Sequence, residues 1–204
     1  MSGLTIAQHE RSEHWHFRTQ LFIQEADTIR TGKIVFLGNS ITEGFDLEKY
    51  FSQTRPVNRG ISGDHIDGLL ERYDYSVLKL LPSKLYILIG INDIGAGDAD
   101  SLILVNYKKL MTKIAATLPE KTVFIQSILP TTSEWSNCPV AQIQRLNRTI
   151  RDYSLHFGFN WINLYDKFVT EDHYLNPSLT SDGLHLNERG YDLWASILNE
   201  HGLK

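Results

Sequence analysis

Short apolar runs alternate along the chain with longer segments in which apolar residues recur every three or four positions. Nearly continuous apolar runs are typical of strands buried on both faces of a parallel sheet, and the longer segments are typical of helices that cover it. The runs predict strands at residues 33–37, 56–58, 85–89, 123–126 and 161–163. The periodic segments predict helices at residues 15–29, 64–80, 100–118, 139–157 and 188–200. We therefore expect an α/β fold, a three-layer αβα sandwich with a five-stranded, mainly parallel sheet.

The ends of these elements carry local signals. Asp64 can cap the helix that starts there, and Gly158 can end the helix at 139–157. The segment 129–139 is rich in Pro, Thr, Ser and Asn, which makes it the best candidate for a long functional loop. No internal repeat, low-complexity tract or linker divides the chain. Residues 1–204 are therefore predicted to form a single domain, with residues 1–32 as an N-terminal helical segment packed on it.

Composition narrows the class of protein. The 204 residues carry a net charge of −4, so the chain lacks the basic surface of a phosphate-backbone binder, and nucleic acid is not an expected partner. The single cysteine, Cys138, cannot form an internal disulfide and is compatible with a reducing compartment. The first thirty residues are too polar for a signal peptide, and no stretch has the length of a membrane-spanning helix. We expect a cytoplasmic protein, although a secreted or periplasmic protein whose leader had been removed would look the same. The oligomeric state stays open.

Candidate catalytic residues follow the predicted strands. Ser40 lies in the turn Gly38-Asn39-Ser40 after the first strand, and the pair Asp182 and His185 precedes the last helix. A serine hydroxyl becomes a good nucleophile when an imidazole takes its proton and a carboxylate fixes the imidazole tautomer. Gly60 and Asn92 each follow a short apolar run and could donate an N–H to an oxyanion. Because ligands bind beyond the carboxyl ends of parallel strands, these groups should meet at one edge of the sheet. Taken alone, Ser40 could equally be a helix N-cap.

Four blocks in this order resemble the GDSL-type esterases, also called SGNH hydrolases: residues 36–42, Asn58-Arg59-Gly60, Gly90-Ile91-Asn92-Asp93 and Asp182-Gly-Leu-His185. The resemblance implies a flavodoxin-like SGNH hydrolase fold. It implies that Ser40 is the nucleophile, that His185 is the general base and that Asp182 orients it. Backbone N–H groups of Ser40 and Gly60 and the side-chain amide of Asn92 would form the oxyanion hole. The family usually has Asp where this chain has Asn39, which can still hold such a bend but alters the charge beside Ser40.

These residues predict a metal-independent serine esterase that needs no cofactor and acts on a small-molecule ester. We favour short acyl groups, such as acetyl, on a sugar or another small alcohol, because the sequence shows no long apolar lid. Trp135 could stack on a sugar face or could instead fold onto the core. Lysophospholipase or thioesterase activity and a non-catalytic carbohydrate- or protein-binding module are the alternatives. The remaining substrate-binding candidates are Asn39 and three polar residues of the expected rim: Thr42, Ser62 and Asp93.

Metal and nucleotide sites are not expected. His14 and His16 are two positions apart, so they point away from each other on a helix. No strand is followed by a Gly-Lys-Ser/Thr ending or a Gly-x-Gly-x-x-Gly pattern, which disfavours nucleotide cofactors. The short spacing from Asp182 to His185 also argues against the α/β-hydrolase fold. The other histidines have no matching group of carboxylates nearby in sequence and are predicted to be surface residues: His9, His65, His156, His173 and His201.

Overall fold

The computed structural model describes residues 9–203, so residues 1–8 of the predicted N-terminal segment, and Lys204, lie outside the described residues. The predicted parallel sheet is confirmed, with five strands in the order β2-β1-β3-β4-β5. All four pairings between neighbouring strands are parallel. The predicted strand ends are correct to within two residues. The strands are β1 (Ile34–Gly38), β2 (Val57–Gly60), β3 (Lys84–Leu88), β4 (Val123–Gln126) and β5 (Asn160–Ile162).

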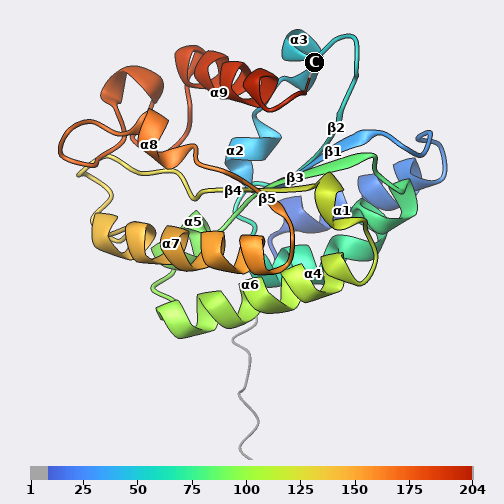
Figure 1. Cartoon of the computed structure of the whole chain (residues 1–204), viewed down its shortest axis with the longest axis horizontal. Helices are drawn as coiled ribbons and strands as arrows, with labels where there is room; N and C mark the ends of the chain where they lie inside the picture. The colour runs from blue at the N-terminus through green and yellow to red at the C-terminus, as the bar shows by residue number, and fades with distance from the viewer. Residues whose placement is uncertain (1–8, 204) are drawn as a thin grey trace, which may run out of the picture.

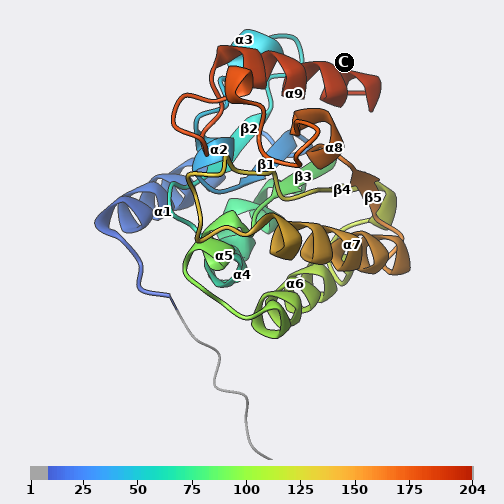
Figure 2. The ribbon, with the colours of Figure 1, turned by 90° about the vertical axis from the view of Figure 1, so that its left-hand side faces the viewer.

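Helices cover both faces of the sheet (Figures 1 and 2). One face is covered by α1 (Glu13–Ala26), α4 (Ile66–Ser76), α6 (Asp100–Ala115) and α7 (Val140–His156). Across the other face lies α9 (Glu188–Glu200), with the short helices α2 (Ser40–Glu43), α3 (Leu47–Tyr50) and α8 (Tyr165–Phe168). The remaining short elements are α5 (Ile91–Gly95), η1 (Leu78–Leu80), η2 (Glu120–Thr122) and η3 (Pro177–Leu179).

The five long helices were predicted, but the one at 64–80 was too long. It ends at Ser76, and the 3₁₀ turn η1 follows it. Gly158 ends α7 as predicted, with φ of 74° just beyond the helix C-cap. The one-turn helices were missed because so few residues show no periodicity. None of the helices within residues 9–203 combines the length and the apolar character needed to cross a membrane.

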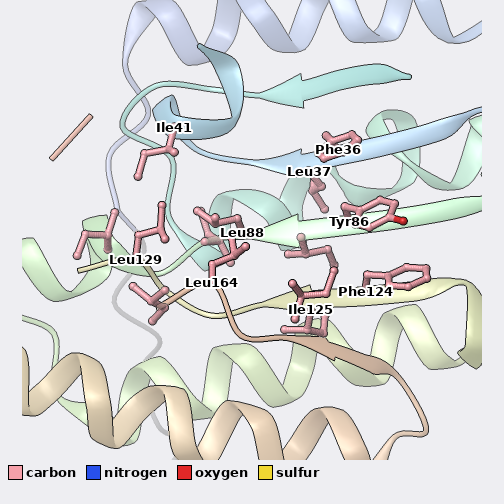
Figure 3. Close-up of a cluster of buried hydrophobic side chains, with 14 of the residues drawn as sticks. Phe36, Leu37, Ile41, Tyr86, Leu88, Phe124, Ile125, Leu129 and Leu164 are labelled. Atoms are coloured by element: carbon pink, nitrogen blue, oxygen red, sulfur yellow. The ribbon is translucent and has the colours of Figure 1, made fainter. Parts of the chain in front are cut away.

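An aromatic ladder fills the layer between the sheet and α9. Phe36, Tyr86 and Phe124 occupy matching positions on β1, β3 and β4, and their rings stack at centroid distances of 5.0 and 4.5 Å (Figure 3). Trp194 of α9 meets Phe36 edge-on, and its indole Nε1 donates to Gln126 at 2.7 Å. Buried rings on neighbouring strands hold the strands in register, because a shift of one residue would move each ring to the opposite face.

Asp64 does not cap α4, contrary to the sequence prediction. The N-cap position belongs to His65, and the Asp64 side chain is buried beneath it. There it accepts hydrogen bonds from the Arg72 guanidinium at 2.8 Å and from the Trp15 indole Nε1 at 3.0 Å. Arg72 also donates to the carbonyl of Gly38 at 3.0 Å. A charged pair of this kind is retained in a core only when its hydrogen bonds are satisfied, and here it joins α1, α4 and the end of β1.

The strand register brings the site residues to one edge of the sheet. Gly38, the last residue of β1, is paired with Gly60 of β2 and Leu88 of β3. A side chain at Gly60 would overlap the backbone of Glu43, so glycine lets α2 sit directly on the end of β2. The segments that follow β1, β2 and β3 therefore start close together, as the sequence predicts.

Candidate active site

Ser40 is the first residue of α2 and directly follows the turn after β1. Its Oγ lies 2.9 Å from Nε2 of His185, which is 145 residues away in the chain. The other ring nitrogen of His185, Nδ1, lies 2.7 Å from Oδ2 of Asp182. The structure thus brings together the serine, imidazole and carboxylate that the sequence singles out, in the order that activates a hydroxyl.

The turn that carries Asp182 and His185 is held from several directions. Oδ1 of Asp182 accepts the backbone N–H groups of Leu184 and His185 at 3.0 and 2.7 Å. The Trp135 indole Nε1 donates to the carbonyl of Asp182 at 2.9 Å. Partial burial alone would raise the pKa of Asp182, but the hydrogen bonds from His185 and Leu184 outweigh it and lower the pKa to about 2. Asp182 therefore stays a carboxylate that accepts a hydrogen bond from Nδ1–H of His185.

Asn92 lies at the start of α5, on the neighbouring strand end. Gly90 precedes this helix with φ of 119°, a conformation that favours glycine. The Asn92 side-chain Nδ2 donates one hydrogen to the carbonyl of Asp64 at 2.9 Å, which fixes the orientation of the amide. The second hydrogen on Nδ2 remains available, as an amide that stabilises an oxyanion requires.

The backbone N–H of Gly60 is not available to a substrate, and this corrects the sequence prediction. It donates to the side-chain oxygen of Asn58 at 2.8 Å, while Asn58 Nδ2 donates to carbonyls of α2 and the turn after it. Gly63, three residues further on, is exposed, has φ of 76° and lines the same cavity as Asn92. The Gly63 amide has no protein partner among residues 9–203. In the sequence, the only sign of this alternative to Gly60 is the second glycine of Gly60-Ile61-Ser62-Gly63.

A cavity of about 270 Å³ lies beside these groups. Gly63, His65 and Asn92 contribute polar groups to its lining, and Trp135 also borders it. Leu184 also lines the cavity. Because Leu184 directly precedes His185 in the chain, the cavity lies next to the pair formed by Ser40 and His185. Buried apolar or weakly polar side chains provide a further part of the lining: Ile91, Cys138 and Leu184.

Residues 36–193 match the model of the GDSL-like Lipase/Acylhydrolase family. The chain belongs to this family. The resemblance seen in its four sequence blocks is thereby confirmed.

Solved structures similar to this member of the family share its fold. A GDSL-like lipase from Bacteroides thetaiotaomicron is 26% identical, with a TM-score of 0.80 over 90% of this chain and 96% of that one. A protein from Streptococcus pneumonia, provisionally named a platelet activating factor, is 24% identical, with a TM-score of 0.86 over 94% of each chain. An N-acylneuraminate cytidylyltransferase from Streptococcus agalactiae is 27% identical over 187 residues. Those residues are 87% of this chain but only 39% of that relative.

Three residues predicted to bind substrate, Asn39, Thr42 and Asp93, are buried, and the predicted rim position is wrong for Thr42 and Asp93. Asn39 is the N-cap of α2, Thr42 lies inside α2, and Asp93 accepts a backbone N–H at the start of α4. Burial raises the pKa of Asp93 to about 7. Ser62 is exposed, as a rim residue should be. Trp135 was predicted either to fold onto the core or to face a substrate sugar. It lies half-buried against the core and also lines the cavity, so it has features of both positions.

His9 and His65 are not isolated surface histidines, which corrects the sequence prediction for these two residues. Their rings stack in parallel at 3.6 Å, with Asp67 beside them, and ligand atoms of the three residues lie within 4.8 Å of one another. The three residues are placed so that they could hold a metal ion, but Asp67 is already paired with Arg11 at 3.1 Å, which competes for its carboxylate. Burial and the neighbouring His9 lower the pKa of His65 to about 4, so His65 presents a neutral ring to the cavity.

Proposed function

We propose that this protein is a serine esterase that removes short acyl groups, acetyl above all, from a sugar or another small polar alcohol. The observation that carries the proposal is the continuous chain of contacts from Ser40 through His185 to Asp182, at 2.9 and 2.7 Å, beside a small cavity. The N-cap of α2 is Asn39, so a capping role does not account for Ser40, whereas the contact with an imidazole fits a nucleophile.

The reaction proposed for this site proceeds through an acyl-enzyme. Nε2 of His185 takes the hydroxyl proton as Oγ of Ser40 attacks the ester carbonyl carbon. The tetrahedral intermediate collapses, and the leaving alcohol receives the proton from His185. A water molecule then attacks the acyl group with His185 as base, which releases the carboxylic acid and returns the proton to Ser40. The charge of Asp182 stabilises the imidazolium that forms in both steps.

Three donors are proposed for the oxyanion: the backbone N–H groups of Ser40 and Gly63 and the side-chain amide of Asn92. Gly63 takes the place first predicted for Gly60, because the Gly60 amide is bound to Asn58. The N–H of Ser40 belongs to the first residue of α2, and it has no protein partner among the described residues. Preorganised donors of this kind stabilise the charge that develops on the carbonyl oxygen.

The preference for short acyl groups rests on the size and surroundings of the cavity. Its volume of about 270 Å³ offers no long channel. The loop at 129–139 bears exposed Ser133, Glu134 and Ser136, which suit a polar alcohol better than an alkyl tail. Each extra methylene would contribute about 0.8 kcal/mol only if it found an apolar pocket. Chain length beyond the cavity should therefore bring no gain.

The test is a series of esters of one alcohol with acyl chains from about two to twelve carbons, together with acetylated sugars. We expect kcat/KM to be highest for acetyl to butyryl esters and to fall beyond about six to eight carbons. A fluorophosphonate should label the wild-type protein and leave Ser40→Ala unlabelled. Octanoyl or longer esters as best substrates would favour the lysophospholipase or thioesterase alternative. No labelling and no turnover would favour a binding module.

A further inference from the structure

We propose that Glu43 is a positioning residue that fixes the turn carrying Gly63, and that helix α1 influences catalysis through Glu43. This inference rests on the proposed function, because it concerns the orientation of a proposed oxyanion donor. Glu43 is the last residue of α2, one turn after Ser40. The helix that presents the nucleophile therefore also carries the group that holds the donor turn.

Glu43 binds the turn at Ser62. Its Oε2 accepts the backbone N–H of Ser62 at 2.6 Å and the Ser62 hydroxyl at 2.6 Å. Ser62 is exposed and precedes Gly63 directly. Two hydrogen bonds to one charged oxygen fix both the main chain and the side chain of Ser62.

Helix α1 holds the same carboxylate from the other side. Nε2 of His14 lies 2.9 Å from Oε1 of Glu43, and Nε of Arg18 lies 3.2 Å from that oxygen. Partial burial alone would raise the pKa of Glu43, but the hydrogen bonds from Ser62 and His14 lower it. Glu43 is therefore a fixed negative charge between α1 and the turn. Because α1 precedes the matched segment 36–193, the family comparison does not include this support.

The orientation of Gly63 depends on what holds its two neighbours. On one side, Asp64 is fixed by Arg72 and Trp15 at 2.8 and 3.0 Å. On the other side, the bonds of Ser62 to Glu43 provide the anchor. Gly63 itself, with φ of 76° and no side chain, has the backbone freedom to turn its N–H away once one anchor is lost. A donor displaced by about 1 Å can cost roughly 100-fold in rate.

The experiment compares kcat and KM of wild type, Glu43→Ala, Glu43→Gln and Ser62→Ala on an acetyl ester. Glu43→Ala should lower kcat by about 10- to 100-fold and leave KM nearly unchanged, because a displaced oxyanion donor acts in the transition state. Glu43→Gln keeps an acceptor oxygen for Ser62 and should recover most of kcat. Ser62→Ala loses only the hydroxyl and should lose less than Glu43→Ala.

Glu48→Ala is the matched control, because Glu48 is an exposed glutamate on α3 whose side chain makes no hydrogen bond to any described residue. This variant should match wild type. Thermal unfolding of each variant separates a loss of kcat from a loss of fold. The inference would be overturned if Glu43→Ala kept wild-type kcat, if its loss were confined to KM, or if Glu43→Gln were no better than Glu43→Ala. In each of these cases an active wild type would still support the proposed function. An inactive wild type would overturn both.

Discussion

Replacement of Asp93 by Asn should change how the stability of the protein depends on pH. The Asp93 side chain is fully buried, and its Oδ1 accepts the backbone N–H of Ile66 at 3.2 Å. Burial raises its pKa from 3.8 to about 7, with smaller contributions from the negative charges of Asp98 and Asp67. Asparagine keeps an acceptor oxygen for Ile66 and carries no titratable proton. The variant therefore removes the titration with little change in shape.

The sign follows from the two pKa values of Asp93. Between about pH 4 and pH 7 the unfolded chain has released this proton while the folded chain keeps it, so the free energy of unfolding falls as pH rises. The slope reaches at most about 1.4 kcal/mol per pH unit. Over the whole interval the Asp93 contribution is up to ~4 kcal/mol, and it is constant above the folded-state pKa.

The assay is urea unfolding of wild type and Asp93→Asn from about pH 4.5 to 8. We expect the difference in free energy of unfolding between the two proteins to grow in favour of the variant as pH rises toward 7, then to level off. Asp172→Asn, a change at an exposed aspartate, is the control and should follow wild type at every pH. Parallel curves for wild type and Asp93→Asn would refute the raised pKa of Asp93.

Three further predictions concern the site. Ser40→Ala and His185→Ala should each abolish nearly all ester hydrolysis, and the double variant should be scarcely worse than either, because the two residues act as one unit; multiplicative losses in kcat would contradict this. Asn92→Ala should lower kcat on the order of 100- to 1000-fold with little effect on KM, and a variant that mainly raises KM would place Asn92 in ground-state binding. Ester hydrolysis should persist after exhaustive chelation, whereas loss with EDTA and recovery with a divalent ion would point to a metal-dependent reaction.

The sheet and the long helices were predictable because their signals are local. Val123–Gln126 is a continuous apolar run that ends in one glutamine, and the sequence placed this strand without error. The predicted end of β2 is two residues too early, because Arg59 interrupts the apolar pattern. In the fold its guanidinium packs 4.4 Å from the ring centroid of Phe22 and pairs with Glu25. Arg59 can be buried in β2 because Phe22 and Glu25 of helix α1 pack against it and pair with it.

The errors in the site have the same origin. Asp64 looked like a cap because its partners, Trp15 and Arg72, are 49 and 8 positions away in sequence. Asp93 and Thr42 looked like rim residues because polarity suggests exposure, whereas both lie inside the packed layers. Choosing Gly63 over Gly60 required knowing which amide was already bonded. The order of the four blocks was enough to place Ser40 and His185 together, but no local pattern revealed what surrounds them.

The separation of 145 positions between Ser40 and His185 also determines when the proposed chemistry can begin. During synthesis, the segment with β1 and Ser40 is complete while the turn at Asp182 is not yet made, so Ser40 is as unreactive as any other serine. On refolding, β1, β2 and β3 can pair before α9 docks, since none of their pairings involves the last segment. Recovery of hydrolysis should therefore lag behind recovery of secondary structure. Enzyme activity would then report arrival of the final helix, and only completed molecules would carry a reactive serine.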